Sequence, residues 1–161
     1  MKILVTVGTT EYDSLISYID SAPYFCDFSV EFQIANGKYL PQNHSFFTFI
    51  SIEDIMKKYR EADLIITHAG ASTINKLLEM KKKFIVVPNL ERSDRHQIDI
   101  ADFISKNKYA LVAYSLSQLE IFTDIIQNIN FKTFNKETFF KSEEIVDYIL
   151  GTDNPNGVLS E

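Results

Sequence analysis

ADLIITHAGASTINKLLEM, residues 62–80, joins a short apolar run to a helical pattern through a polar turn that contains a glycine. The apolar run at 64–67 is continuous, which is typical of a strand covered on both faces. After the turn, Ile74, Leu77 and Leu78 recur at the spacing of one helix face. A buried strand that leads directly into a helix indicates a parallel sheet whose strands are connected by helices.

The same alternation continues along the rest of the chain. It predicts an α/β fold with a doubly wound, mostly parallel, Rossmann-like sheet over residues 1–150, followed by a flexible polar tail at 151–161. A Ser-x-x-Asp cap at Ser51 indicates the start of one helix. The other elements follow from hydrophobic periodicity. Strands are expected at 3–7, 28–34, 45–50, 64–67, 84–87 and 109–112, and helices from 51 and at 71–81, 94–106, 115–128 and 143–150.

Length, charge and cysteine content limit the class of protein. A chain of 161 residues is one domain by length, and its formal net charge of −6 argues against a nucleic-acid binder. The single cysteine, Cys26, excludes an internal disulfide framework and is expected to be buried packing. No apolar stretch is long enough for a signal peptide or a membrane span. The lysines at 81–83 read either as a solvated turn or as a weak attraction to anionic lipid.

Three segments are expected at one edge of the sheet, because ligands of open α/β sheets bind outside the carboxyl ends of the strands. They are residues 8–10 after the first strand, 68–73 after the fourth and 88–97 after the fifth. Helix N-termini carry unpaired N–H donors and a partial positive charge, which suits an anion. Two such loops side by side fit a diphosphate, although Ser72 and Thr73 could instead be ordinary helix caps.

The third segment adds an amide to this edge. Gln97 heads the apolar stripe of its helix, and an amide buried there without a partner would be unfavourable. A cleft in which Gln97 binds a polyhydroxylated ligand would satisfy it. The alternative is that Asp94 caps the helix and His96 is solvated. The histidines lack the spacing of metal ligands, so neither a metal nor a cofactor is expected.

The stretches ILVTVGTTEYDSLI, THAGASTI and VVPNLERSDRHQIDIADFI together resemble the C-terminal-domain family of glycosyltransferase family 28. The resemblance extends over about residues 1–150. It is strongest to free-standing small subunits of two-protein transferases, which serve dolichol-linked oligosaccharide synthesis in eukaryotes and capsule or exopolysaccharide assembly in bacteria. It implies the nucleotide-sugar-binding half of an inverting GT-B enzyme, a hexosyltransferase inactive alone, with a UDP-sugar as its substrate.

The resemblance also implies which residues meet the donor. The matching positions are Gly8, Thr9, Thr10, His68, Ala69, Gly70, Ala71, Ser72, Thr73, Pro88, Asn89, Asp94, His96 and Gln97. Family members commonly carry an acidic residue on the following helix to hold the ribose, whereas this chain has Lys76. Glu79 lies three residues later, about 4.5 Å along the helix, so the ribose contact is open between Lys76 and Glu79. The general base is open between His68 and a residue of the second protein.

The resemblance further implies a membrane-anchored subunit that binds a lipid-linked saccharide acceptor. This chain would then be cytoplasmic and peripheral to the membrane. The aromatic-rich stretch at 130–150 reads either as packing on its own sheet or as the surface that docks this partner, through Phe139, Phe140, Ile145 and Ile149. Two rival functions remain: a non-catalytic nucleotide-sugar-binding module that regulates or scaffolds a partner, and a flavodoxin-like nucleotide domain.

Overall fold

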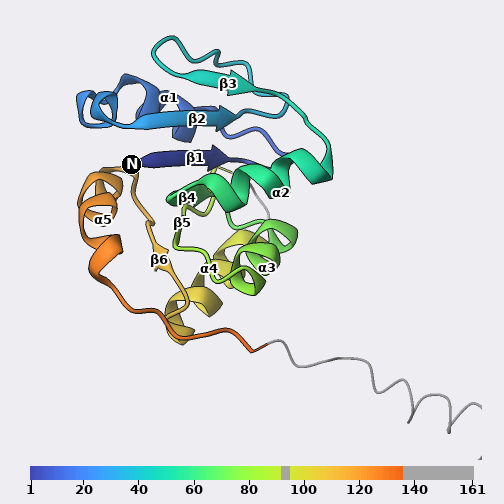
Figure 1. Cartoon of the computed structure of the whole chain (residues 1–161), viewed down its shortest axis with the longest axis vertical. Coiled ribbons are helices and arrows are strands. Elements are labelled where there is room, and N and C mark those ends of the chain that lie inside the picture. The colour runs from blue at the N-terminus through green and yellow to red at the C-terminus, as the bar shows by residue number, and fades with distance from the viewer. Residues whose placement is uncertain (92–94, 136–161) are drawn as a thin grey trace, which may run out of the picture.

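A six-stranded parallel sheet forms the centre of the molecule, as the computed structural model of residues 1–91 and 95–135 shows (Figure 1). Its strands lie in the order β3-β2-β1-β4-β5-β6. Every pair of neighbouring strands is parallel, so all six carboxyl ends lie at one edge. The strands are β1 (Lys2–Thr6), β2 (Ser29–Gln33), β3 (Ser45–Phe47), β4 (Leu64–Thr67), β5 (Phe84–Val86) and β6 (Leu111–Val112). The predicted doubly wound α/β class is confirmed.

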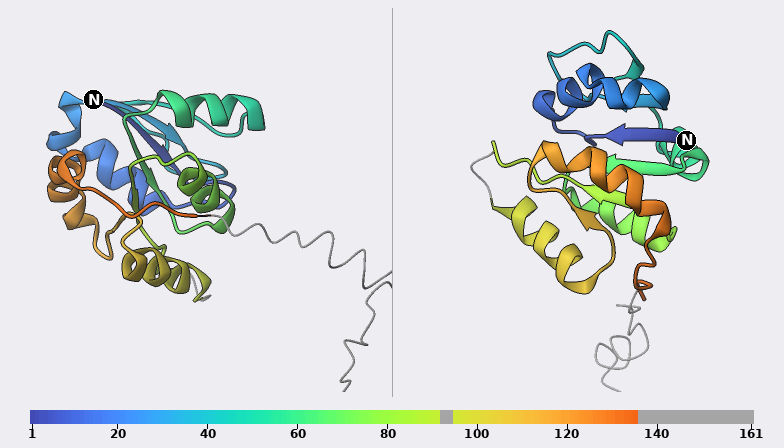
Figure 2. Two further views of the ribbon diagram at one scale, coloured as in Figure 1. Left: turned by 60° about the horizontal axis from the view of Figure 1, so that its bottom comes forward. Right: turned by 90° about the vertical axis from the view of Figure 1, so that its left-hand side faces the viewer.

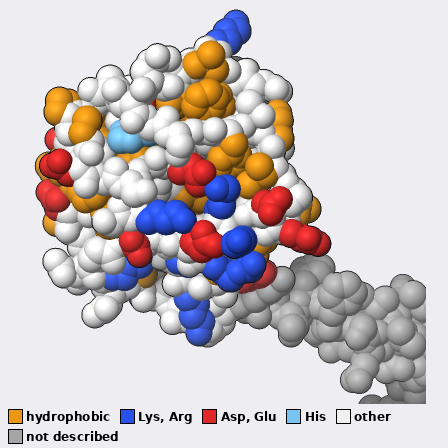
Figure 3. All heavy atoms as spheres, turned by 45° about the horizontal axis from the view of Figure 1, so that its top comes forward, with side chains coloured by type: hydrophobic (Ala, Val, Ile, Leu, Met, Phe, Trp, Pro, Cys, Tyr) orange, Lys and Arg blue, Asp and Glu red, His pale blue; other side chains and the backbone are white. Residues whose placement is uncertain are grey.

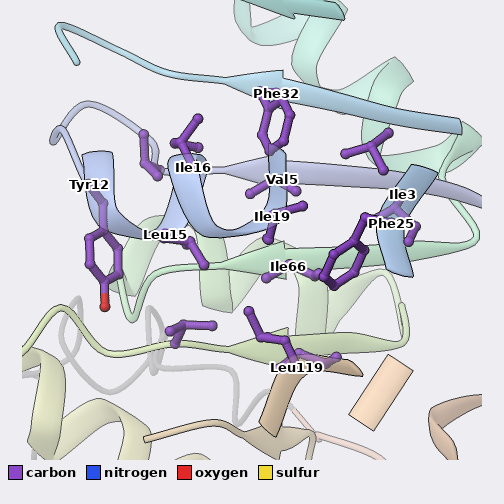
Figure 4. Packing of buried hydrophobic residues seen from close by; sticks show 14 of the residues in the cluster. Ile3, Val5, Tyr12, Leu15, Ile16, Ile19, Phe25, Phe32, Ile66 and Leu119 are labelled. Atoms are coloured by element: carbon purple, nitrogen blue, oxygen red, sulfur yellow. The ribbon is translucent and has the colours of Figure 1, made fainter. Parts of the chain in front are cut away.

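Helices cover both faces of this sheet, as the views in Figure 2 show. One layer contains α1 (Asp13–Ser21), the short 3-10 helix η1 (Pro23–Asp27), η2 (Leu116–Gln118), α5 (Leu119–Ile125) and η3 (Ile126–Asn128). The other contains α2 (Ile52–Glu61), α3 (Ala71–Glu79) and α4 (His96–Asn107). Side chains alternate along each strand, so Ile3 and Val5 pack against α1 while Leu4 packs on the opposite face. Figure 4 shows the α1 side of this core, where Phe32 and Ile66 belong to the same buried cluster as Leu15, Ile16 and Ile19 of the helix.

Most predicted elements form, but several end earlier than their apolar runs. The third strand stops at Phe47 because Phe49 and Ile50, counted as strand from sequence, turn away and line a cleft. The sixth strand starts at Leu111, because Lys108 ends α4 in the left-handed conformation and Tyr109 N–H closes that helix on the Ile104 carbonyl. The predicted helix at 115–128 begins and ends as 3-10 turns. The predicted helix at 143–150, the tail at 151–161 and the four docking residues lie outside the described residues.

The structure also bears on three smaller expectations. Cys26 is exposed, which corrects its expected burial, because it lies in η1 on the outer side of Phe25. Lys82 and Lys83 are not simply solvated. The Lys82 ammonium donates to the Ala62 carbonyl at 2.6 Å, and the Lys83 ammonium to the Ile126 carbonyl at 3.2 Å. These two lysines therefore satisfy carbonyls where α2 and α5 end. In the part of the chain that the structure describes, no helix is both long and apolar enough to cross a bilayer.

Two aromatic residues of the C-terminal stretch are described, and both pack on the chain's own core. Phe131 contacts the α1 side of the core, and Phe134 contacts the α3 side. The ring centroid of Phe134 lies 5.6 Å from that of Tyr109 in an edge-to-face arrangement. This part of the stretch therefore follows the packing interpretation.

A buried carboxylate holds the long connection between β2 and β3. Asp20, at the end of α1, is fully buried and accepts hydrogen bonds from the Tyr39 hydroxyl at 2.9 Å, Gln42 N–H at 2.8 Å and Asn43 N–H at 3.1 Å. Burial alone would raise the pKa of Asp20, but these hydrogen bonds outweigh it and hold the pKa below its ordinary value of 3.8. The ionised form is thus the form that stabilises the fold.

Replacing Asp20 with asparagine is expected to lower the free energy of unfolding by about 3 kcal/mol, because hydrogen bonds to a charged acceptor contribute about 1.5–3 kcal/mol each. A lowered folded-state pKa means that this contribution is present above pH 3.8 and is lost as the pH falls through the folded-state value. Urea unfolding at pH 7 and at pH 3 measures both. The exposed Asp27→Asn is the control, and an equal loss there would contradict this role.

Candidate functional site

The strand order places a cleft between β1 and β4, where the chain reverses its direction of winding. From β1 the chain proceeds outward to β2 and β3, and then returns to β4 on the other side of β1. Open α/β sheets bind ligands at such a point. A cleft of about 650 Å³ lies there, within the usual range for small-molecule sites. Its walls come from the end of β2, from the loops after β1, β3 and β4, and from α2, α3 and α4. They are Gly8, Thr9, Thr10, Gln33, Phe49, Ile50, Ile52, Ile55, Tyr59, His68, Ala69, Gly70, Ala71, Ser72, Thr73, Lys76, His96, Gln97 and Ile100.

The N-terminus of α3 opens into this cleft without a side-chain cap. Gly70 occupies the N-cap position, where it has no side chain to offer, and the first intrahelical bond runs from Ile74 N–H to the Gly70 carbonyl at 3.0 Å. The N–H groups of residues 71–73 therefore have no acceptor within the helix. The helix α2 differs, because Ser51 Oγ accepts from Asp54 N–H at 3.1 Å. Ser72 and Thr73 lie inside the first turn of α3, so the interpretation of them as caps is wrong.

The imidazole of His68 fills the space between the two glycine loops. His68 is only 7% exposed. A Cβ placed on Gly70 would lie 2.5 Å from His68 Nε2, and a Cβ on Gly8 would lie 3.0 Å from His68 Cε1. Both positions therefore need glycine for the ring to sit where it does. The two loops predicted to lie at one edge do meet, and His68 is the side chain that joins them.

The loop after β1 differs from its expected form. Gly8 has a φ of 61°, and Thr10 N–H donates to the Val7 carbonyl at 3.2 Å, so residues 7–10 form a tight turn. The helix α1 begins only at Asp13. This loop therefore lines the cleft as a turn rather than as the start of a helix, which corrects the predicted similarity to the loop before α3.

The loop between β5 and α4 is anchored by internal hydrogen bonds. Gln97 Oε1 accepts from Asn89 N–H at 2.9 Å, and the Tyr12 hydroxyl donates to the Pro88 carbonyl at 3.2 Å. Burial, together with the charge of Glu91, raises the pKa of Tyr12 to about 12, so this hydroxyl keeps its proton at neutral pH. The structure thus gives Gln97 an internal partner as well as a place in the cleft wall.

Other predicted residues of this segment have different positions. Pro88 and Asn89 are buried behind the cleft and are absent from its described walls. His96 is exposed and lines the cleft as the first residue of α4, and Arg95 rather than Asp94 occupies the N-cap position. Asp94 itself lies outside the described residues.

An apolar wall faces the α3 N-terminus, and sequence reasoning missed it. Phe49, in the expected strand at 45–50, is 49% exposed, and Ile52, in the expected helix from 51, is 70% exposed. Ile50, Ile55 and Tyr59 complete this wall, which we call the apolar wall. The signal available in the sequence was Thr48, the polar residue that separates Phe49 and Ile50 from the strand before them.

The charge of the cleft is opposite to that of the whole chain. None of the described residues that line it is acidic, although the chain carries 22 Asp and Glu residues. Lys76 is the only lysine or arginine among the described lining residues, whereas Glu79 is exposed and absent from the described walls. On the face drawn in Figure 3, by contrast, acidic and basic side chains are interspersed. Of the two ribose candidates, Lys76 is the one that lines the cleft. Within the described ranges, no three histidine, cysteine or acidic side chains cluster as a metal site.

Comparisons with known proteins identify relatives of this chain. The human UDP-N-acetylglucosamine transferase subunit ALG13 is 33% identical over 117 residues, which are 65% of this chain and 10% of that protein. The Yarrowia lipolytica protein of the same name is 28% identical over 127 residues, which are 70% of this chain and 65% of that protein. In Streptococcus thermophilus, UDP-N-acetylglucosamine–N-acetylmuramyl-(pentapeptide) pyrophosphoryl-undecaprenol N-acetylglucosamine transferase is 37% identical over 87 residues, 52% of this chain and 24% of that enzyme. This chain therefore spans less than two thirds of each of these relatives.

Solved structures show the same fold. The MurG structure from Acinetobacter baumannii superposes with a TM-score of 0.62 at 21% identity, covering 94% of this chain and 52% of that one. A solution structure of ALG13 superposes with a TM-score of 0.58 at 18% identity, covering 90% of this chain and 93% of that one. The profile described as "Glycosyltransferase family 28 C-terminal domain" matches residues 2–145. With its parallel sheet, its cleft at the switch point and this match, the chain belongs to the glycosyltransferase family 28 C-terminal domain family.

Proposed function

We propose that this chain is the donor-binding subunit of an inverting glycosyltransferase. It would hold a UDP-sugar while a hexose or N-acetylhexosamine passes to a lipid-linked acceptor. The observation that carries the proposal is the cleft at the β1/β4 switch point, which combines uncapped helix N–H groups, one lysine and an apolar wall. Each of these features matches one part of a nucleoside diphosphate sugar.

The diphosphate fits the N-terminus of α3. The N–H groups of residues 71–73, the Ser72 hydroxyl and the Lys76 ammonium all lie at this side of the cleft. Helix N-termini with free donors bind phosphate groups. The base fits the apolar wall, because an aromatic ring such as Phe49 and neighbouring isoleucines give a flat heterocycle a surface on which to pack. The sugar would then extend toward His96 and Gln97 at the start of α4.

The same donors support the chemistry of transfer. When the sugar leaves, negative charge grows on the departing nucleoside diphosphate, and preorganised N–H donors together with a lysine stabilise it in the transition state. His68 is enclosed between Gly8 and Gly70. Its burial favours a role in holding the two loops over a role in deprotonating the acceptor. The acceptor hydroxyl would be deprotonated by a base from another chain.

A second subunit follows from this division of labour. The relatives named above include proteins described as subunits of a UDP-N-acetylglucosamine transferase. A membrane-anchored partner would bring the acceptor, and this chain would act from the cytoplasmic side of the membrane. The lysine at position 76, where the resemblance implies an acid, favours bacterial capsule or exopolysaccharide assembly as the setting.

A second candidate function is supported by one observation. Because no acidic side chain lines the described part of the cleft, these walls hold no carboxylate that could act as a base. A non-catalytic module that binds a nucleotide sugar and regulates or scaffolds a partner would need none. Reconstitution with the partner separates the two candidates, since a regulatory module would be dispensable for turnover.

The proposal is tested by calorimetric titration of the full chain with UDP, UDP-N-acetylglucosamine, UDP-galactose and UDP-glucose, with ADP, GDP and FMN as comparison ligands. Saturable binding of uridine nucleotides alone is the expected result. The relative affinities of the three UDP-sugars would then identify the preferred donor. Binding of FMN in place of UDP would instead establish the flavodoxin-like reading. Binding of a purine nucleotide with no affinity for UDP would overturn the glycosyltransferase assignment.

Replacing Lys76 with methionine is expected to weaken UDP binding about 5- to 10-fold, because a cation several ångströms from a diphosphate contributes on the order of 1 kcal/mol at a partly exposed site. Methionine keeps the apolar stem, so the change removes mainly the charge. The loss should shrink as salt rises from about 50 to 500 mM. Lys81→Met, an exposed lysine outside the cleft, is the matched control. Stronger UDP binding by Lys76→Met would contradict the assigned role.

A further inference from the structure

The last residue of β2, Gln33, is a polar side chain in the cleft that the sequence patterns did not single out. It is only 7% exposed, yet it belongs to the cleft wall. The strand β2 lies between β1 and β3, as Figure 1 shows. Gln33 therefore lies between the turn at Gly8, which follows β1, and the part of the apolar wall that follows β3. It occupies the junction between the polar and apolar halves of the cleft.

A chain of hydrogen bonds holds the amide oxygen of Gln33 away from the cleft. Thr6 and Gln33 are partners in the parallel ladder. Gly8 N–H donates to Thr6 Oγ1 at 3.3 Å, and the Thr6 hydroxyl donates to Gln33 Oε1. Thr6 is fully buried, so its hydroxyl proton cannot go to solvent and needs an acceptor inside the protein. Gln33 Oε1 supplies that acceptor.

The orientation of the amide follows from this proton count. If the amide were reversed, its nitrogen would face Thr6 Oγ1, which would then have Gly8 N–H and Gln33 N–H as neighbours and no acceptor for its own proton. With the oxygen committed to Thr6, the Gln33 amide nitrogen carries two N–H donors on the cleft side. Among the described residues, none accepts a hydrogen bond from this nitrogen.

The Gln33 side chain is more than nine-tenths buried, but its amide nitrogen, which has no acceptor among the described residues, opens onto the cleft, where a ligand oxygen can accept its hydrogen bond. The chemistry of the cleft identifies that acceptor, since the neighbouring α3 N-terminus and Lys76 favour an anion and the apolar wall favours a base. We propose that the Gln33 amide nitrogen donates a hydrogen bond to an oxygen of the nucleoside diphosphate portion of the donor. Thr6 is a positioning residue, which sets the direction of that amide. This inference rests on the proposed function and adds a binding residue to it.

The location of Gln33 also predicts which ligands depend on it. Gln33 ends β2, whereas His96 and Gln97, at the start of α4, follow β5 on the other side of β1 and β4. A contact at Gln33 therefore belongs to the part that UDP and every UDP-sugar share. Removing this contact should weaken the binding of UDP and of a UDP-sugar by the same factor and leave the preference among sugars unchanged.

The experiment compares Gln33→Met and Gln33→Glu with the wild-type chain by calorimetric titration of UDP and UDP-N-acetylglucosamine. Methionine keeps the length of the side chain and removes the donor, and about a 10-fold loss for both ligands is expected. Glutamate keeps the acceptor for Thr6 but places a carboxylate oxygen toward the diphosphate, so a loss of about 100-fold is expected. Gln127→Met, an exposed glutamine far along the chain in η3, is the control and should bind as the wild type does.

The role of Thr6 is tested by coupling. Thr6→Val keeps the shape but removes the hydroxyl, and a 3- to 5-fold loss is expected, with Thr6→Ser restoring wild-type affinity. In the double variant Thr6→Val/Gln33→Met, the loss should equal that of Gln33→Met alone, because both changes act through one hydrogen bond to the ligand. A merely structural threonine would instead add its own loss of UDP affinity in the double variant.

The outcomes separate this inference from the proposed function. If the wild-type chain binds UDP and both Gln33 variants bind it equally well, the inference is overturned and the proposed function stands. A loss confined to the UDP-sugar would place the contact on the sugar and also overturn the inference. If the wild-type chain binds no uridine nucleotide, both fail together. The unfolding midpoint of each variant shows whether a loss of binding is a loss of folded protein. If a Gln33 variant does not fold, the UDP affinity of Thr6→Val tests the inference instead.

Discussion

Replacing Gly70 with aspartate is expected to reduce UDP binding by more than about 100-fold. Two effects act in the same direction. A Cβ at this position would lie 2.5 Å from His68 Nε2, so the imidazole must leave the space between the two loops. The added carboxylate also places a negative charge at the uncapped N-terminus of α3, where the diphosphate is proposed to bind. The measurement is calorimetric titration of the wild-type and variant chains with UDP.

Two further variants separate the causes. Gly70→Ala introduces the steric conflict alone and should lose about 10-fold, so the remaining loss in Gly70→Asp reports the charge and should diminish in high salt. Gly37→Ala is the control for stability, because its Cβ would lie 2.5 Å from Asp13 Oδ1 and 2.9 Å from the Ile34 carbonyl, away from the cleft. It should lower the unfolding midpoint but leave UDP affinity unchanged. Wild-type affinity in Gly70→Asp would contradict a diphosphate site at α3.

Replacing Phe32 with alanine is expected to lower the free energy of unfolding by about 3–5 kcal/mol. Phe32 is fully buried between β2 and α1, where Figure 4 shows it above Val5 and Ile19. The substitution removes a large apolar side chain from the hydrophobic core and leaves a cavity that the rigid sheet cannot close. Urea unfolding with a constant slope between wild type and variant measures the change.

The adjacent strand offers a matched control. Phe46 is the register partner of Phe32 on β3, but it is 41% exposed. Phe46→Ala should therefore cost less than about 1 kcal/mol. Similar losses for the two phenylalanines would contradict the difference in burial on which this prediction rests. Because neither residue lines the cleft, UDP affinity should be unchanged in whichever fraction of each variant remains folded.

The layers of this fold were predictable from the sequence because each strand and helix has its own hydrophobic periodicity. Continuous apolar runs such as 64–67 indicated strands covered on both faces, and the spacing of Ile74, Leu77 and Leu78 indicated the helix that follows. The Ser51 cap marked the start of α2 correctly. The glycine-containing loops at Gly8 and Gly70 were predicted to meet at one edge, and they do.

Element ends were less predictable, because a run of apolar residues does not state which neighbour it packs against. Phe49 and Ile50 continue the apolar run of β3, yet they face the cleft. The helix α1 received no bounds from sequence, although Leu15, Ile16 and Ile19 share its buried face. Asp20, near its end, is buried by a loop that lies further along the chain.

By itself, the sequence determined an α/β chain with a parallel sheet, two glycine loops at one edge and an overall acidic charge, because hydrophobic period, glycine and charge are local or additive properties. Only the tertiary structure decided which residues the cleft contains. Gln33 lay inside a predicted strand, and its role depends on a threonine 27 residues away that takes up its amide oxygen. His68 is held by glycines from the loops after two different strands. Such contacts join segments that the sheet brings together, and no period along the chain encodes them.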